Sequence, residues 1–353
     1  MVGRPCAGVK PGVRDSQCRV TEQVAYTASM PAPQTDPYPA LSARYSAFFA
    51  LPAQAAAPQS EVFDWTDGRL RLDRHGPAEA GLTVLLVHGA GGYGRMFAPL
   101  AAELAAAGYE VLAPDLPGYG LSPAPWQQVD YGVWKQALLA LIDAEHQRRP
   151  RPFVLFGASI GGYLAYLVAA ESPWVRGLAA TTLADPRDPA VQAALVRQRW
   201  MRALLPGLRP LSRLTRGLRV PVRWFTHMQR MSRNPALTAL VCADPLGGGN
   251  RVPVGLLASL FDTSPAVEPE QFQRCPVLMA HPACDDWTPV AISDRFYQRL
   301  AAPKQRVLLE ECGHFPVEQP GLDQLRDALL PFLARTDGIA PLQTTDFNDL
   351  ARK

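Results

Sequence analysis

Ser159 is the side chain of this sequence best placed to do chemistry. It stands in the GxSxG motif of residues 157–161 (GASIG), between the apolar run FVLF and a helical pattern. A serine nucleophile needs a tight strand-to-helix turn with small neighbours, so that its oxygen projects from the sheet where the helix N-terminus favours negative charge. The motif predicts Ser159 as a nucleophile, although GxSxG also arises by chance in chains rich in glycine and alanine.

A base and an orienting carboxylate follow Ser159 along the chain. His314 comes after the apolar run QRVLLE and can take the serine proton and return it to a leaving group; the alternative is a loop histidine with a structural hydrogen bond. Asp285 follows the run VLMA, at a strand end where functional groups of parallel sheets collect. Its neighbour Asp286 is the rival for orienting the imidazole. Serine, aspartate, histidine is the chain order expected for a triad on an α/β sheet.

The loop HGAGG at residues 88–92 follows the apolar run TVLLV. The oxyanion of an acyl transfer needs two preorganised N–H donors. We expect these donors to be the backbone amides of Ala90 and of Ile160, the residue after the nucleophile.

The same loop allows a second interpretation. Residues 89–94 (GAGGYG) also fit the GxGxxG pattern, and Asp115 lies 21 residues further on, as the ribose-binding acid of a dinucleotide site would. This alternative leaves Ser159, Asp285 and His314 without a role. We therefore consider dinucleotide binding the weaker hypothesis.

The predicted strands and helices that position these residues alternate regularly along the chain. Short apolar runs alternate with helical patterns from Thr83 onward, and again after residue 276. Strands that are apolar on both faces and separated by helices predict a parallel sheet covered on both sides. We expect an α/β core in two parts, residues 59–185 and 271–335, which opens with a hairpin around Asp67-Gly68.

Residues 186–270 interrupt this alternation of strands and helices and are rich in arginine. Eleven arginines and a single acid, Asp188, lie between Arg187 and Arg233 inclusive. Prolines and glycines break this stretch, so several short helices are expected. The local charge suggests contact with an anionic lipid surface or headgroup, although the whole chain prefers arginine to lysine. Its apolar side chains could line an acyl pocket or form the insertion's own core: Trp200, Met201, Leu204, Leu205, Trp224, Phe225, Met228 and Met231.

Taken together, the segments HGAGG, DLPGYGLS, GASIGG, CDDWTP and CGHFPVEQP resemble the α/β-hydrolase superfamily, particularly its monoacylglycerol lipase, lysophospholipase and carboxylesterase branch. The resemblance spans about residues 83–334. It implies a triad of Ser159, Asp285 and His314, a cap formed by the insertion, and hydrolysis of a monoacyl or medium-chain ester through an acyl-enzyme. No metal or organic cofactor is implied. Tyr119 stands where many members have histidine.

The sequence distinguishes this activity from only some of the other reactions found on the same fold. Dehalogenases and epoxide hydrolases resemble this sequence but carry aspartate as the nucleophile in the strand-to-helix turn, so Ser159 argues against both. Thioesterases, amidases and acyltransferases share the serine triad and remain open as alternatives. A non-catalytic ligand-binding protein on this fold is a further alternative.

Composition narrows the class of protein. With 353 residues, 48% of them hydrophobic, the chain is neither disordered nor fibrous, and a net charge of +3 is too weak for a general nucleic-acid binder. No apolar run approaches the roughly 18 residues that span a bilayer, and no early signal segment stands out, so a cytoplasmic protein is expected. Six cysteines without CxxC pairs predict reduced thiols and no zinc site. Residues 1–58, with eight prolines, are expected to form a flexible arm, and residues 336–353 a polar tail.

Overall fold

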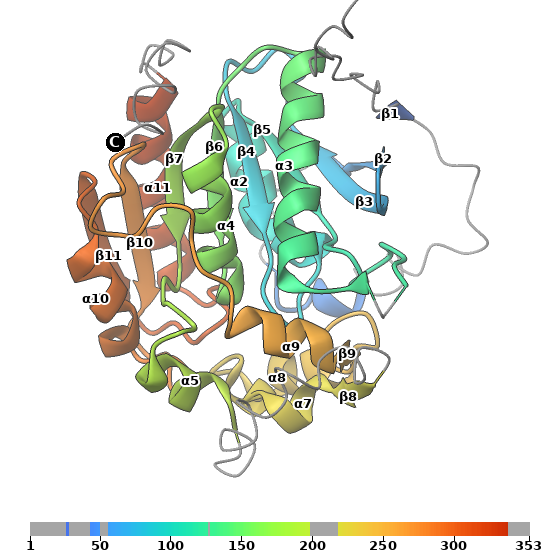
Figure 1. Ribbon diagram of the computed structural model, residues 1–353, viewed down its shortest axis with the longest axis vertical. Helices are drawn as coiled ribbons and strands as arrows, with labels where there is room; N and C mark the ends of the chain where they lie inside the picture. Colours follow the sequence, from blue (N-terminus) through green and yellow to red (C-terminus); the bar gives the residue numbers. More distant parts are fainter. Residues whose placement is uncertain (1–25, 28–42, 50–55, 126–127, 198–217, 338–353) are drawn as a thin grey trace, which may run out of the picture.

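The computed structural model describes residues 26–27, 43–49, 56–125, 128–197 and 218–337 (Figure 1). One nine-stranded sheet runs through these residues in the order β1-β2-β3-β5-β4-β6-β7-β10-β11. Its strands are β1 (Tyr26–Thr27), β2 (Gln59–Trp65), β3 (Gly68–His75), β4 (Thr83–Val87), β5 (Glu110–Pro114), β6 (Phe153–Gly157), β7 (Val175–Ala180), β10 (Val277–Pro282) and β11 (Lys304–Leu309). The pairs β1-β2, β2-β3 and β3-β5 are antiparallel, and every other pair is parallel.

Helices cover both faces of the sheet, which explains why its central strands are apolar throughout. One face carries α2 (Ala98–Ala106), which follows the short helix η1 (Gly94–Phe97), and α11 (Gly321–Asp337). The other face carries α3 (Tyr131–Arg148), α4 (Ile160–Glu171) and α10 (Val290–Arg299). Alternate residues of β4 serve the two faces: Leu85 packs with Leu138 and Leu164, whereas Leu86 packs with Leu104 and Leu329. The predicted α/β core is confirmed.

The opening hairpin forms with a small shift. Trp65 lies opposite Gly68, so residues 66–67 make the two-residue turn, one position earlier than expected. β3 then joins β5, which attaches the hairpin to the parallel part of the sheet.

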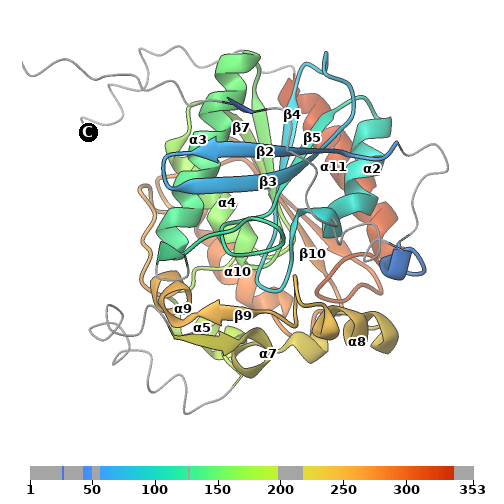
Figure 2. The same ribbon diagram turned by 90° about the vertical axis from the view of Figure 1, so that its right-hand side faces the viewer.

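The insertion lies at one end of the sheet, over the carboxyl ends of the parallel strands (Figures 1 and 2). We call residues 186–270 the cap. Its described elements are α5 (Pro189–Leu195), β8 (Arg219–Pro221), α7 (Val222–Phe225), η3 (Met228–Arg230), α8 (Pro235–Ala243), β9 (Arg251–Pro253) and α9 (Val254–Leu260). The cap contains several short helices, as expected, and in addition the strands β8 and β9, which pair antiparallel as a separate sheet. Strands of three residues are too short to show an alternating pattern.

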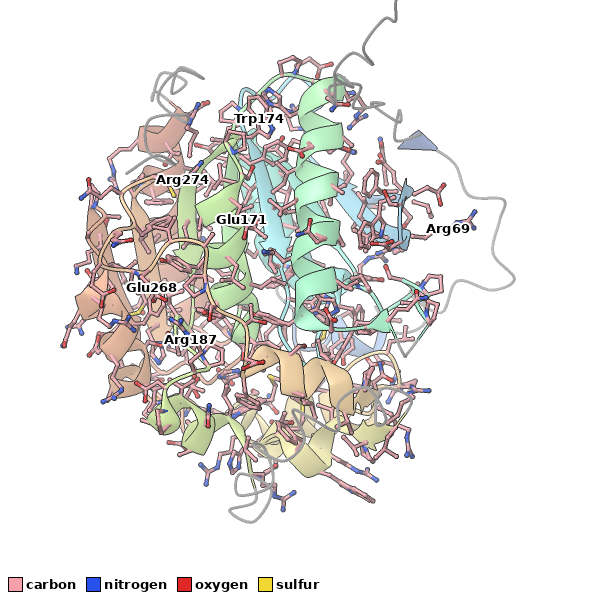
Figure 3. The ribbon with its side chains drawn as sticks, in the orientation of Figure 1. Arg69, Glu171, Trp174, Arg187, Glu268 and Arg274 are labelled. Atoms are coloured by element: carbon pink, nitrogen blue, oxygen red, sulfur yellow. The ribbon has the colours of Figure 1, made fainter. Side chains whose placement is uncertain are left out.

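An ion-pair cluster joins the two ends of the cap. Arg187 Nη2 lies 2.6 Å from Asp185 Oδ2 at the start of the cap and 2.8 Å from Glu268 Oε2 near its end. Figure 3 shows Arg187 and Glu268 side by side at this junction. The hydrogen bonds of Arg187 to both carboxylates raise the pKa of its guanidinium.

The expectation of a flexible arm is wrong for residues 43–49. Tyr45 is only 2% exposed, its hydroxyl donates to Asp244 Oδ2 at 2.9 Å, and its ring stacks on Phe49. β1 also pairs with β2. Isolated contacts of this kind have no periodicity, so the sequence pattern does not reveal them. The rest of residues 1–55 lies outside the described residues.

The polar tail begins slightly later than expected. α11 continues to Asp337, and Thr336 is fully buried. Residues 338–353 are not among the described residues. Within the described part of the chain, no helix is both long and apolar enough to cross a bilayer. The four cysteines in that part are free: Cys242, Cys275, Cys284 and Cys312.

Candidate active site

Ser159 occupies the turn between β6 and α4. Its backbone has φ 55° and ψ −129°, a conformation that residues other than glycine seldom adopt. Small neighbours make the turn possible: a Cβ on Gly161 would lie 2.3 Å from the Val87 carbonyl oxygen, and a Cβ on Gly89 would lie 2.9 Å from Ser159 Cβ. The turn therefore packs against the end of β4, and Ser159 lines a cavity beneath the cap.

Asp285 and His314 meet at the ends of β10 and β11. His314 Nδ1 lies 2.8 Å from Asp285 Oδ2, and both side chains are buried. Thr288 Oγ1 donates to the same Asp285 oxygen at 2.7 Å, and the backbone amides of Trp287 and Thr288 donate to Oδ1 at 2.9 and 2.8 Å. Burial raises the pKa of the Asp285 carboxyl, but His314 and the Thr288 hydrogen bonds outweigh it and lower the pKa to about 2. Asp285 is therefore a firmly ionised partner for the imidazole.

The neighbouring carboxylate lies elsewhere. Asp286 is exposed, and its contact with the cap is made by its backbone oxygen, which accepts from Arg230 Nη1 at 2.7 Å. Of the two candidates for orienting His314, the structure brings only Asp285 to the imidazole.

The second ring nitrogen of His314, Nε2, is not used by Asp285. His314 Nε2 is buried and has no hydrogen-bond partner among the described residues. The Trp287 ring packs on the imidazole with 4.4 Å between ring centroids, and Trp287 lines the same cavity as Ser159. The structure contains no hydrogen bond between Ser159 Oγ and His314 Nε2. Such bonds are often long in unliganded enzymes and shorten when substrate is bound.

Ala90 and Ile160 line the same cavity as Ser159. Within the described residues, neither backbone amide has an acceptor, so both remain available to a ligand. Tyr131 supports the first turn of α4, because its hydroxyl donates to the Ile160 carbonyl at 2.6 Å.

His88 holds the loop that contains Ala90. The Leu116 amide donates to His88 Nε2 at 2.9 Å, so the proton is on Nδ1, which donates to the Gly89 carbonyl at 2.9 Å. Burial lowers the pKa of His88 to about 4, against the opposing effect of the Gly89 hydrogen bond. His88 is therefore a neutral bridge between the loops that follow β4 and β5.

The dinucleotide alternative does not fit this geometry. Asp115 is fully buried, its Oδ1 accepts from the Gly94 amide, and its Oδ2 accepts from the Leu121 amide, both at 2.8 Å. The carboxylate that would bind a ribose is instead used to fold two loops.

The Ser159 cavity is narrow and apolar. Its free volume is about 30 Å³, close to the space of one water molecule. The cap supplies most of its wall: Leu195, Val222, Phe225, Thr226, Val252, Leu256, Leu257, Leu260 and Phe261. No charged side chain is among the described lining residues.

The apolar cap residues singled out in the sequence differ in their placement. Phe225 lines the cavity, and Met228 and Met231 are buried. Trp224 is 60% exposed, so its expected place in a pocket or in the cap core is wrong. Trp200, Met201, Leu204 and Leu205 are not among the described residues.

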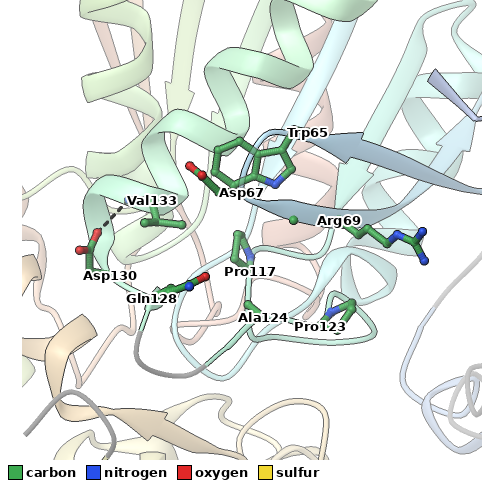
Figure 4. Close-up of a pocket in the computed structure, with 10 residues that line it drawn as sticks. Trp65, Asp67, Arg69, Pro117, Pro123, Ala124, Gln128, Asp130 and Val133 are labelled. Carbon is green, nitrogen blue, oxygen red and sulfur yellow. Dashed lines mark hydrogen bonds between the residues drawn. The ribbon is translucent and has the colours of Figure 1, made fainter. Parts of the chain in front are cut away.

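A larger cavity of about 310 Å³ lies away from Ser159 (Figure 4). It is formed by the β2-β3 turn, the loop after β5 and the start of α3, with Trp65, Gln128 and Asp130 in its wall. The Asp130 carboxylate caps α3 by accepting from the Val133 amide at 2.8 Å. The described wall contains none of the candidate catalytic residues, so size alone does not mark the site.

Sequence reasoning missed two links between the cap and the catalytic loops. Glu318 accepts from the amide of Gly313, beside His314, at 2.6 Å and from the amide of cap residue Arg233 at 2.7 Å. Asp244 of the cap accepts from the hydroxyls of Tyr45 and Tyr93, each at 2.9 Å. No spacing rule connects residues so far apart in sequence. The role of Thr288 had a weak signal, since it lies three residues after Asp285.

Comparisons with known proteins identify the family of this chain and the proteins that it resembles. Residues 78–319 match the model of the serine aminopeptidase S33 family, Hydrolase_4. A haloalkane dehalogenase of Psychrobacter cryohalolentis is 34% identical over 119 residues, which are 32% of this chain and 37% of that protein. A pimeloyl-[acyl-carrier protein] methyl ester esterase of Legionella pneumophila is 33% identical over 104 residues, 30% of this chain and 37% of that protein. The chain thus matches little more than a third of the length of these two curated relatives.

Solved structures match over more of the chain. The monoacylglycerol lipase of Paleococcus ferrophilus is 26% identical with a TM-score of 0.60, over 76% of this chain and 99% of that one. A soluble variant of the monoglyceride lipase of Saccharomyces cerevisiae has a TM-score of 0.67 at 16% identity, over 82% of this chain and 98% of that one. At 16% identity, the similarity to the Saccharomyces cerevisiae enzyme shows a shared fold alone.

Proposed function

The chain belongs to the serine aminopeptidase S33 family and is an α/β-hydrolase of the lipase and esterase type; from this premise we propose that it cleaves carboxylic esters of monoacyl lipids or medium-chain acyl groups. The observation that carries the proposal is the hydrogen bonding of the two ring nitrogens of His314. Asp285 occupies its Nδ1, whereas Nε2 has no partner among the described residues. The imidazole packs against Trp287, which lines the same cavity as Ser159.

The proposed chemistry passes through an acyl-enzyme. Ser159 Oγ attacks the ester carbonyl carbon as its proton moves to His314 Nε2, and Asp285 stabilises the imidazolium. The amides of Ala90 and Ile160 hold the oxyanion. The bond to the alcohol then breaks, and the alcohol leaves with the proton from His314. Water attacks the acyl-enzyme and gives its proton to His314, which returns it to Ser159 as the acid departs.

The cavity wall supports an acyl group as the part of the substrate that is recognised. Its described residues are uncharged and mostly apolar, so they would bind a hydrocarbon chain and leave a charged one without a partner. The monoacylglycerol lipase of Paleococcus ferrophilus, to which this chain is similar, is named for a monoacyl substrate. A free volume of about 30 Å³ is too small for a medium chain, so substrate entry requires the cap wall to move. We place the reaction in the cytoplasm, where the free cysteines would stay reduced.

Hydrolysis of p-nitrophenyl esters from acetate to palmitate tests this proposal, with fluorophosphonate labelling of the wild type and of Ser159→Ala. We expect labelling of the wild type alone, a rate maximum at one chain length, and a loss of at least about a thousandfold in the variant. An unlabelled wild type would overturn the serine mechanism and leave a ligand-binding protein as the better interpretation.

An amide substrate is the second candidate, because the family is described as serine aminopeptidases. Parallel assays with p-nitroanilides of the same acyl chains separate the two. Labelling with anilide turnover and no ester turnover would favour the amidase. Halide release from a haloalkane is expected to be absent, since Ser159 stands where the dehalogenases of this fold use aspartate.

A further inference from the structure

We propose that the outer side of α7 docks this protein onto an anionic lipid–water interface. The interface would deliver the substrate, so the biological meaning of the docking rests on the proposed function. The binding itself does not depend on it.

Two of the three large exposed apolar side chains described in this protein belong to the cap. Three large apolar side chains are exposed in the described part of the chain: Trp224 (60%), Leu218 (57%) and Leu308 (45%). Trp224 and Leu218 lie six residues apart in the cap, whereas Leu308 belongs to the edge strand β11. An indole with one apolar and one polar side suits the boundary between lipid headgroups and acyl chains.

The described part of the cap on either side of Trp224 is rich in arginine. Residues 189–197 and 218–243 contain five arginines and no aspartate, glutamate or lysine. Arg197, Arg223 and Arg251 are exposed. The guanidinium groups of Arg197 and Arg251 donate to the backbone carbonyls of Arg223 and Arg219, at 3.4 and 2.9 Å, which leaves their charge uncompensated by those contacts. In the core, by contrast, Arg74 is held by the carboxylates of Glu61, Glu110 and Glu145.

α7 has two sides with different tasks. Val222 and Phe225 line the Ser159 cavity, whereas Arg223 and Trp224 are exposed on the outside. Figures 1 and 2 both show α7 at the edge of the cap remote from the sheet. α7 therefore contributes both to this outer surface and to the wall of the Ser159 cavity. Because the cavity must widen to admit an acyl chain, the helix that would meet the lipid is also part of the wall that must move.

The combination of an indole with arginines points to a lipid surface. A soluble polyanion would use the arginines and gain little from Trp224. A neutral bilayer would use Trp224 and gain little from the arginines. An anionic bilayer uses both, with a contribution that falls as salt screens the charges.

Cosedimentation with vesicles of phosphatidylcholine, alone or mixed with phosphatidylglycerol, tests the proposal. The full-length Ser159→Ala protein is used, so that the vesicles stay intact and the result does not depend on ester hydrolysis. We expect binding to the mixed vesicles, weakened by salt. Added Trp224→Ser should lower the partition coefficient about tenfold, and Arg223→Gln about fivefold.

Leu308→Ser is the matched control, because it removes an exposed leucine from the edge strand β11, outside the cap, and should leave binding unchanged. A thermal melt of each variant verifies that it is folded. Equal binding to neutral vesicles, or wild-type binding by Trp224→Ser, would overturn the proposal. Displacement by inorganic polyphosphate that does not depend on Trp224 would also overturn it and indicate a polyanion site. A protein that binds vesicles but never cleaves esters would contradict the proposed function and leave this inference standing.

Discussion

Two parts of the cap differ in how they are held. Residues 228–249 are bonded to the loops that carry the candidate site: the Phe315 amide donates to the Met231 carbonyl at 2.7 Å, and Glu318 and Asp244 add the links described above. Among the described residues, the hydrogen bonds of α7 are made within the cap. The Val222 amide donates to the Asn250 carbonyl at 3.0 Å, and the Arg197 amide donates to the Phe225 carbonyl at 2.9 Å.

The part of the cap with fewer bonds to the core can move at lower cost. Carboxylates that accept several hydrogen bonds are expensive to separate from their donors, above all the fully buried Asp244. Residues 228–249 are therefore expected to stay with the loops that carry the candidate site. α7 contacts the core through apolar packing around the Ser159 cavity, and such contacts can rearrange without leaving a charge unpaired. The cap is therefore better described as an anchored part and a displaceable wall than as one rigid lid.

The largest effect is expected at the site that the anchored part supports. Asp285→Asn should lower kcat/KM by about 10⁴-fold, because the amide no longer stabilises the imidazolium or selects the productive tautomer of His314. Asp286→Asn is the matched control, since its side chain is exposed, and should keep near wild-type activity. Steady-state kinetics on one p-nitrophenyl ester measure both. Equal losses in the two variants would show that Asp285 has no special role.

Acid should destabilise the protein through two buried histidines of the core. Burial lowers the pKa of His75 and of His88 to about 4, below the 6.5 of an exposed histidine, so the unfolded chain binds more protons between these values. Stability from these groups is therefore complete above pH 6.5 and lost as the pH falls toward 4, by about 3 kcal/mol for each histidine. Denaturant unfolding at a series of pH values measures the loss. His88→Gln should make the slope shallower by about one proton, and an unchanged slope would contradict the assignment.

Breaking an anchor should affect both stability and catalysis. Glu318→Gln keeps the shape but weakens the charge-assisted bonds from the amides of Gly313 and Arg233, so we expect about 2 kcal/mol of lost stability and a lower kcat through misplacement of His314. Arg251→Gln, in the part of the cap with α7, is the control and should leave kcat unchanged on a soluble ester. A wild-type kcat for Glu318→Gln would remove the distinction between the two parts of the cap.

A smaller effect is expected at the second anchor. Tyr45→Phe removes one of the two hydroxyl donors to Asp244 and should cost about 1.5 kcal/mol in unfolding free energy, since Tyr93 still binds the same oxygen. Tyr93→Phe is the matched partner, and the double variant should lose more than the sum of the two, because it leaves Asp244 without either hydroxyl. Strict additivity of the two losses in denaturant unfolding would show that the hydroxyls do not act together.

Local patterns were enough for much of this protein. The alternation of apolar runs and helical segments predicted the α/β core, because strands covered on both faces must be apolar throughout. The GxSxG motif predicted the turn at Ser159, because Gly161 has to approach Val87 too closely for a side chain. The position after each strand predicted where Asp285 and His314 emerge, although the pairing of His314 with Asp285 and not with Asp286 needed the three-dimensional arrangement.

The class of fold and the residue types at the strand ends follow from local patterns, since both depend on interactions between near neighbours in the chain. Three features depend on the folded arrangement: Tyr45 reaches Asp244, Glu318 joins the His314 loop to the cap, and Trp224 is exposed while Phe225 lines the Ser159 cavity. These contacts join residues up to 199 positions apart. No local preference encodes them, because each exists only once packing has brought the separate segments together.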